Sequence, residues 1–162
     1  YVRLKHVSPG YNYLQGKTVK LPHLVIRYAE ILLNYVEALN EYDPGNPDIL
    51  TYLNMVRERA GLPGVAEGLD QDQMRDRIHH ERRVELCFEQ IRYFDTRRWL
   101  KGYLNGGPFE GMNVDGGASY DDPAFYQRTV FETRVFRDAY YLWPIPQKEI
   151  NRDRNIIQNP GW

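Results

Sequence analysis

The run from Tyr28 to Leu39 most constrains the fold, because its apolar residues recur at the spacing of a helix. The members of this stripe are Tyr28, Ile31, Leu32, Tyr35, Val36 and Leu39. Apolar residues at this period place one buried face on an amphipathic helix. The sequence Asp43-Pro44-Gly45 interrupts the pattern. We therefore expect a helix that ends before this break and packs against a partner.

A second helix follows the break at once. Asn46 can cap a helix N-terminus, and Pro47 is tolerated at the first helical position. Gly61 and Pro63 then end the helix near Ala60. Its expected apolar face is Ile49, Leu53, Val56 and Ala60, with Tyr52 alongside. The two runs predict an antiparallel pair of helices on a short loop.

A third helix is predicted from Asp70 to Trp99, with a bend near Gln90. Asp70 can cap the helix while Gln73, three residues later, reaches back in the capping-box arrangement. Cys87 lies inside this run and is the only cysteine of the chain, which excludes an intrachain disulfide. We interpret it as a small, buried, structural residue.

The sequence changes character at Lys101. From there to Arg137 it is rich in glycine and aromatic residues and has no sustained period, which predicts long surface loops. We expect one domain over residues 1–162, divided into a helical part at 22–100, a loop-rich part at 101–142 and a C-terminal tail at 143–162. The fold class is therefore mainly α, with a tetratricopeptide-like helix pair and long irregular loops.

The composition narrows the possible functions. A net charge of -1 gives no general attraction to nucleic acid. No stretch reaches the roughly 18 apolar residues of a membrane span. The chain has 13 tyrosines, whose flat faces and hydroxyl groups suit sugar rings and protein interfaces alike.

Charged residues are dense between Glu81 and Trp99. Glu81, Glu85 and Glu89 would share one face of a helix, where arginines can pair with them. The set that we predict to form a structural ion-pair network is Glu81, Glu85, Glu89, Arg92, Asp95 and Arg98. A glycosidase would instead use two of the carboxylates as catalytic groups. We favour the structural interpretation, because nearby arginines keep carboxylates ionised whereas a general acid needs a raised pKa.

Other catalytic patterns are incomplete, and we predict no catalytic residue. His80-Glu81 begins like a zinc-protease helix, but Val84 occupies the place of the second histidine. Neither serine, Ser8 or Ser119, lies in a nucleophile elbow.

We also predict no metal and no other cofactor. Calcium is the one ion with a partial match, at Asn113, Asp115, Gly116 and Asp122, and that match has Gly111 where the first carboxylate belongs.

Aromatic residues run through the loop-rich part. They are Tyr103, Phe109, Tyr120, Phe125, Tyr126, Phe131 and Phe136. We expect most of them to pack into the core or to anchor loops, and an exposed subset to stack on a sugar. The predicted ligand-binding residues are Tyr103, Asn113, Tyr120 and Tyr126.

Three blocks, in order, resemble the SusD/RagB family of nutrient-binding proteins. The first runs from Leu21-Pro22 through the Arg27 to Leu39 segment and on to Asn54 to Pro63. The second is the Glu81 to Trp99 segment, which is similar to the family's Glu-Arg-Arg-x-Glu-Leu-x-Phe-Glu-x-x-Arg-Tyr-Phe-Asp-x-x-Arg-Trp. The third joins Trp143 to Ile150 with the ending Gln158 to Trp162. Tyr28, Val36 and Trp162 differ from the family's usual residues but keep an apolar or aromatic character.

The resemblance implies a fold and a function. Family members are longer proteins, held at the outer membrane on the cell surface by an N-terminal lipid anchor, which would lie upstream of Tyr1. They cover a SusC-type TonB-dependent transporter and bind an oligosaccharide without cleaving it. The resemblance assigns the helices between Tyr28 and Ala60 to scaffold and partner contact, and the Lys101 to Arg137 loops to the ligand.

Other functions remain open from the sequence. A helical-repeat module that binds proteins would explain the helix pair, although no repeat of fixed period is present. A RagB-like subunit would bind peptide in place of a glycan. A glycoside hydrolase would rest on Glu81, Glu85 and Glu89.

Overall fold

The chain forms two compact units, Tyr1–Arg92 and Tyr93–Trp162. A computed structural model describes residues 5, 8, 10–17, 19, 25–119 and 121–162. The first unit is helical, and the second contains a β-hairpin and several short helices. Each unit is described by itself.

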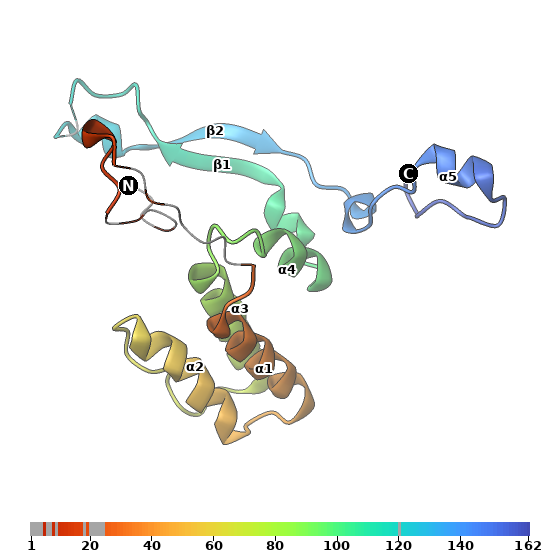
Figure 1. Ribbon diagram of the computed structural model, residues 1–162, viewed down its shortest axis with the longest axis horizontal. Coiled ribbons are helices and arrows are strands. Elements are labelled where there is room, and N and C mark those ends of the chain that lie inside the picture. The colour runs from red at the N-terminus through yellow and green to blue at the C-terminus, as the bar shows by residue number, and fades with distance from the viewer. Residues whose placement is uncertain (1–4, 6–7, 9, 18, 20–24, 120) are drawn as a thin grey trace. The chain divides into compact units, whose positions relative to one another are not determined.

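Three helices build the first unit (Figure 1): α1 (Tyr28–Tyr42), α2 (Pro47–Arg59) and α3 (Gln71–Glu85). Helix α1 packs against both α2 and α3. The predicted pair on a short loop is present, since only four residues separate α1 from α2. The helices confirm the predicted mainly helical fold with a tetratricopeptide-like pair.

The helix ends follow the local sequence signals. The Asn46 side chain accepts a hydrogen bond from the Asp48 backbone, and Asp70 and Gln73 form both bonds of a capping box. After α2, the N–H groups of Gly61 and Leu62 donate to the carbonyls of Glu58 and Arg57, the pattern of a Schellman motif. Gly61 has a φ of 73°, a backbone conformation that glycine adopts without strain. The predicted boundaries of α2 are therefore confirmed to within one residue.

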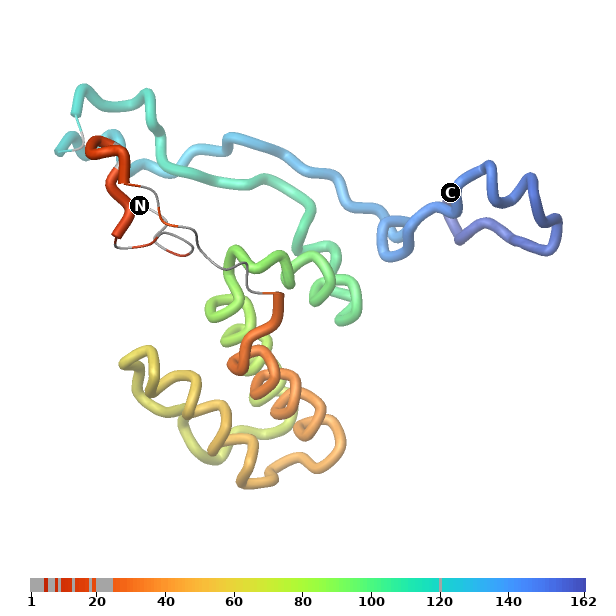
Figure 2. Tube along the Cα trace, viewed as in Figure 1, coloured from red at the N-terminus to blue at the C-terminus, as the bar shows by residue number. Residues whose placement is uncertain are grey.

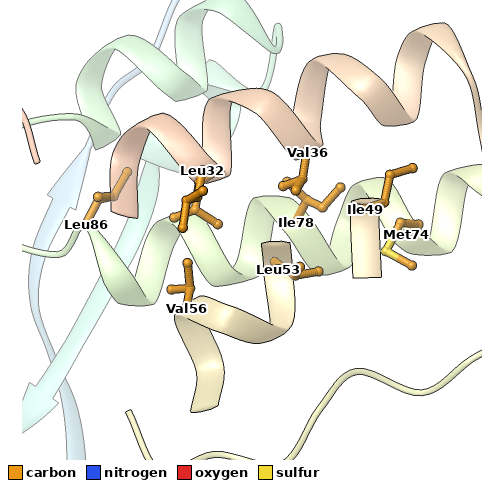
Figure 3. Packing of buried hydrophobic residues seen from close by; sticks show 9 residues of the cluster. Leu32, Val36, Ile49, Leu53, Val56, Met74, Ile78 and Leu86 are labelled. Carbon is orange, nitrogen blue, oxygen red and sulfur yellow. The ribbon is translucent and has the colours of Figure 1, made fainter. Parts of the chain in front are cut away.

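The core of the first unit lies between the three helices (Figure 3). Its buried members are Leu32, Leu33, Val36, Ile49, Leu53, Val56, Met74, Ile78 and Leu86. Leu33, Val36, Leu53 and Ile78 are completely inaccessible to solvent. Ile49, Leu53 and Val56 confirm most of the predicted face of α2, whereas Ala60 is exposed.

The predicted face of α1 was partly wrong. The helix buries Leu32, Leu33 and Val36, while Tyr28, Ile31 and Tyr35 are exposed. The stripe read from the sequence is wider than the face that contacts α2 and α3. Tyrosine counts as apolar in a periodicity pattern, yet its hydroxyl group can remain at the surface.

The run from Asp70 to Trp99 was predicted as one helix with a bend near Gln90. An interruption is present there, but it separates two helices, so the prediction of one continuous helix was wrong. Helix α3 ends at Glu85, and a separate helix, α4 (Arg92–Arg98), follows after a break. Phe88 and Gln90 within this break have φ values of 65° and 67°, which no α-helix can accommodate. Cys87 lies in the break and is exposed, so its predicted burial was also wrong.

The second unit contains an antiparallel hairpin of β1 (Gly107–Met112) and β2 (Arg128–Arg134). Gly107 pairs with Arg134 at one end and Met112 with Arg128 at the other, with an irregularity between Phe109 and Glu110. Figure 2 shows the two segments running side by side. The prediction of loops over 101–137 was therefore wrong for these two strands. Thr129, Val130, Phe131 and Thr133 favour a β-strand, but Gly107 and Gly111 weaken the strand signal of β1.

Short helices precede, connect and follow the two strands along the chain. They are the 3₁₀ helices η2 (Gly102–Asn105), η3 (Pro123–Tyr126) and η4 (Asp138–Tyr141), and the helix α5 (Gln147–Arg152). Helices η2 and η4 contact each other. They bring the segments on either side of the hairpin's Gly107–Arg134 end together.

Candidate functional site

The glutamates of the charged segment pair with cations from distant parts of the first unit. Arg27 Nη1 lies 2.5 Å from Glu85 Oε1, and Arg27 Nε lies 2.8 Å from Glu89 Oε2. Arg59 also pairs with Glu85, and Lys5 with Glu89. Lys5 and Arg27 donate in addition to the backbone carbonyl of Glu85 at the end of α3, where positive charge is favourable.

These contacts determine the charge state of Glu89. Burial acts to raise its pKa, but hydrogen bonds from Arg27 and Lys5 outweigh burial and hold the pKa below its usual value. A general acid needs the opposite shift. The glycosidase alternative therefore gains no support at Glu89.

Glu81 forms a separate and deeper ion pair. Arg57 Nη1 lies 2.5 Å from Glu81 Oε2, and both residues are buried. Arg57 Nε also donates to the Pro63 carbonyl at 2.8 Å. The pair ties α3 to α2 and to the chain that follows α2.

The remaining residues of the predicted network lie in α4. Arg98 donates to Asp95 Oδ1 from Nε at 2.9 Å and from Nη2 at 2.8 Å, and Asp95 is buried. Arg92 is the first residue of the helix. The predicted ladder is therefore distributed over α3, the break and α4, and does not form a single helix face.

Two predicted ligand-binding residues lie at the same end of the hairpin. Asn113 donates from its backbone to the Gln127 carbonyl at 2.9 Å, beside the exposed Tyr126. Tyr103 precedes the opposite end of β1, roughly 20 Å away for a strand of this length. Tyr120 lies outside the described residues. The structure thus brings Asn113 and Tyr126 together but separates Tyr103 from them.

The partial calcium loop is shaped by its own hydrogen bonds. Asp122 caps η3 by accepting from the Ala124 backbone at 2.9 Å. A side chain at Gly116 would begin 2.3 Å from Asn113 Nδ2, so Asn113 fills the turn. Across the described ranges, no group of three or more His, Cys, Asp or Glu residues is placed to hold a metal ion.

An open cleft of about 540 Å³ lies within the second unit, and we take it as the candidate functional site. It is lined by Tyr93, Arg97, Asn105, Glu132, Thr133, Arg134, Val135, Phe136 and Tyr140. These residues come from α4, η2, β2, η4 and the segment between β2 and η4. Ligand pockets in proteins span roughly 300–1,000 Å³ and combine aromatic walls with a few polar groups, which matches this lining.

Arg97 is fixed firmly at the cleft. Its guanidinium carbon lies 3.5 Å from the centroid of the Tyr93 ring, a cation–π contact. Nε donates to the Tyr140 carbonyl at 2.9 Å, and Nη1 donates to the Tyr93 carbonyl at 3.2 Å. The arginine therefore joins α4 to η4 and holds the two tyrosines in place.

The opposite charges of the cleft belong to β2. Arg134 Nη2 lies 2.8 Å from Glu132 Oε2, and the Arg134 guanidinium lies 4.3 Å from the centroid of the Phe109 ring. The hydrogen bond from Arg134 lowers the pKa of Glu132, and the same bond raises the pKa of Arg134. The two charges compensate each other.

Aromatic rings support the cleft from several segments. Tyr140 lies 6.0 Å from Phe136 and 5.5 Å from Trp162 between ring centroids, and Tyr93 lies 5.8 Å from Trp143. The Trp162 indole N–H donates to the Ala139 carbonyl at 3.0 Å. The last residue of the chain therefore braces η4 behind the cleft.

The expectation that most loop aromatics pack inward was only partly correct. Tyr103, Tyr126 and Phe131 are more than half exposed, while Phe109, Phe125 and Phe136 are partly buried.

Tyr93, Arg97 and Tyr140 were not predicted as site residues from the sequence. Tyr93 and Arg97 lie in the part at 22–100 that was predicted to be helical, and Tyr140 lies in the loop-rich part but beyond the Lys101 to Arg137 loops that the resemblance assigned to the ligand. The dense run Tyr140-Tyr141-Leu142-Trp143 is the signal that could have directed attention to η4.

Changing Gly102 to alanine is expected to disturb the cleft wall. A Cβ atom at this position would lie 2.0 Å from Phe136 Cζ, so the ring would have to move. Overpacking of this kind destabilises a protein by about 1–3 kcal/mol. Urea unfolding of the full-length protein would measure the loss. In a Phe136→Leu background the same change should be less destabilising, and an equal loss in both backgrounds would contradict the contact.

None of the helices in the described ranges is long and apolar enough to cross a membrane.

Comparisons with known proteins agree on one family. The family model of the SusD family matches residues 1–162. SusD-like protein P2 of Formosa agariphila is 33% identical to this chain, and the match covers 99% of this chain and 31% of that protein. The chain thus spans about a third of the length of this curated relative.

Solved structures share the fold. A SusD-like protein from Bacteroides fragilis superposes with a TM-score of 0.73 at 34% identity, over 85% of this chain and 25% of that one. A SusD-like carbohydrate-binding protein from Bacteroides vulgatus has a TM-score of 0.53 at 23% identity, over 82% of this chain and 29% of that one. The cleft-forming blocks and the helix pair lie within the matched family model, and the chain belongs to the SusD family.

Proposed function

We propose that this chain is part of a cell-surface subunit that binds oligosaccharides for uptake and does not cleave them. The observation that carries the proposal is the cleft, where Tyr93, Phe136 and Tyr140 supply aromatic surface and Arg97 and Asn105 supply polar groups. Aromatic faces can stack on pyranose rings while the polar groups bond hydroxyls. Membership of the SusD family supports the same function.

The chemistry of the cleft supports binding without hydrolysis. Most glycosidases need two carboxyl groups on either side of the scissile bond. Among the described residues that line the cleft, Glu132 alone has a carboxylate. Arg134 pairs with it and keeps it ionised, which suits hydrogen bonding to hydroxyls better than proton donation.

The proposal extends to a partner and a location. Tyr28, Ile31, Tyr35 and Tyr42 expose apolar surface along α1. Exposed aromatic surface of this kind is typical of protein interfaces. We propose that a SusC-type TonB-dependent transporter is the partner, and that the whole protein is held at the outer membrane by a lipid anchor.

Replacing Tyr140 by alanine is expected to weaken binding of a recognised glycan by about tenfold, the effect of roughly 1.4 kcal/mol. Tyr140 both lines the cleft and packs on Phe136, so its removal takes away a stacking face. A glycan array followed by titration calorimetry on the full-length protein would identify the ligand and measure the change. Reducing-end release is followed in the same samples.

The matched control is Tyr42→Ala, which removes a tyrosine that is 89% exposed on α1. Its affinity should equal that of the unchanged protein. Tyr103→Ala and Tyr126→Ala test the ligand residues predicted from sequence in the same assay. Reducing-end release by the unchanged protein would overturn the proposal in favour of a hydrolase, and binding unaffected by Tyr140→Ala would place the ligand elsewhere.

A further inference from the structure

The cleft carries one positive charge that no carboxylate balances. Glu132 is paired with Arg134, so these two residues contribute no net charge. Arg97 has no carboxylate within ion-pair distance in the part of the chain that the structure describes. The lining therefore has a net charge of plus one that belongs to Arg97.

The orientation of Arg97 leaves donors available. Nε and Nη1 are directed to the carbonyls of Tyr140 and Tyr93, and Nη2 has no hydrogen-bond partner among the described residues. A guanidinium presents more N–H donors than these bonds use. Because the Tyr93 ring stacks on the group at 3.5 Å, its position is fixed before a ligand arrives. A fixed guanidinium loses less conformational entropy on binding than a free one.

We infer that the cleft selects acidic oligosaccharides, those carrying a carboxylate or a sulfate ester, and that Arg97 binds the anionic group. This inference rests on the proposed function, since it names the class of glycan for the same cleft. The N–H groups of a guanidinium can donate to two oxygens of a planar carboxylate or of a tetrahedral sulfate ester, and charge-assisted hydrogen bonds are stronger than neutral ones. Arg97 is half-buried, so solvent screens this interaction less than at an exposed site.

The neighbouring groups suit the rest of such a sugar. Tyr140 and Phe136 offer aromatic surface next to Arg97. Asn105 donates from Nδ2 to Thr96 Oγ1 at 2.7 Å, which fixes the amide and leaves its oxygen to accept from a sugar hydroxyl. An anionic group on Arg97 would therefore place its ring beside an aromatic wall and an acceptor.

The test compares matched acidic and neutral oligosaccharides on the full-length protein. One arm uses oligogalacturonate and its methyl ester, and the other uses a sulfated galactan oligosaccharide and its desulfated form. We expect the acidic form in at least one arm to bind about tenfold or more tightly than its neutral counterpart. Binding of that form should weaken as sodium chloride is raised from about 50 to 500 mM. The arm in which the acidic form binds more tightly shows whether the cleft recognises a carboxylate or a sulfate.

Variants at Arg97 assign the effect to this residue. Arg97→Gln should abolish the preference for the acidic form, whereas Arg97→Lys, which keeps the charge, should retain part of it. Because Arg97 also joins α4 to η4, the salt dependence of the unchanged protein provides a measurement that does not depend on the variants folding.

The outcomes are distinct. Equal binding of acidic and neutral forms, or a preference that survives in Arg97→Gln, would overturn the inference and leave the proposed function standing. Binding of no carbohydrate by the folded full-length protein would overturn the proposed function and the inference with it.

Discussion

Changing Glu81 to leucine is expected to lower the free energy of unfolding by about 3–5 kcal/mol. The change leaves the charge of Arg57 buried without its partner, which is 2.5 Å away in the intact protein. Glu81 is only 3% exposed and Arg57 only 7%, so water cannot take over the lost interaction. Arg57→Met should destabilise the protein by a similar amount. Urea unfolding of the full-length protein, followed by circular dichroism, measures both.

The double variant tests whether the losses arise from the interaction between the two charges. Glu81→Leu combined with Arg57→Met removes both charges and restores an apolar contact, so it should be far less destabilised than either single variant. Glu149→Gln, at the exposed pair with Arg152, is the matched surface control and should leave stability unchanged. Additive losses in the double variant would show that the two charges do not stabilise each other.

Replacing Leu53 by alanine is expected to lower the free energy of unfolding by about 2–5 kcal/mol. Leu53 is completely buried among the side chains of α1, α2 and α3 (Figure 3). Its loss removes apolar burial and leaves a cavity that the surrounding helices fill only in part. Denaturant unfolding of the full-length protein, with the slope of the transition checked for constancy, measures the change.

Met55→Ala is the control for this experiment. Met55 lies on the same helix but is 43% exposed, so its truncation removes similar volume without opening an internal cavity. The alanine there should be nearly neutral. Equal losses at the two positions would mean that the face of α2 assigned to the core is incorrect.

Local sequence signals were sufficient for the helical pair and the caps. Asn46 and Asp70 accept the capping bonds that their positions predicted. Both groups act within a few residues of their own backbone, so no distant segment is needed to form them. The family blocks likewise lie in the sequence itself, and the family model confirms that resemblance over the whole chain.

The sequence predicted a bend near Gln90, but it did not predict that the helix would break after Glu85. Helical periodicity continues through Phe88 and Gln90, yet both adopt left-handed backbone angles. Lys5 and Arg27, far away in the sequence, donate to the carbonyl of Glu85 where α3 stops. Contacts between distant segments outweigh local helix propensity there, and these contacts are invisible to a pattern read along the chain.

The candidate site also depends on both local sequence signals and contacts between distant segments. The sequence by itself determined the helix pair, its caps, the family and an abundance of tyrosine suited to sugars. Only the tertiary structure decided which aromatic residues form a cleft. Tyr93, Asn105 and Tyr140 are far apart in the sequence and line the same cleft, and a hydrogen bond from Arg97 to the Tyr140 carbonyl joins two of its walls. The charge left on Arg97 is likewise a tertiary property, since it depends on which carboxylates fold within reach of the guanidinium and not on how many the chain contains.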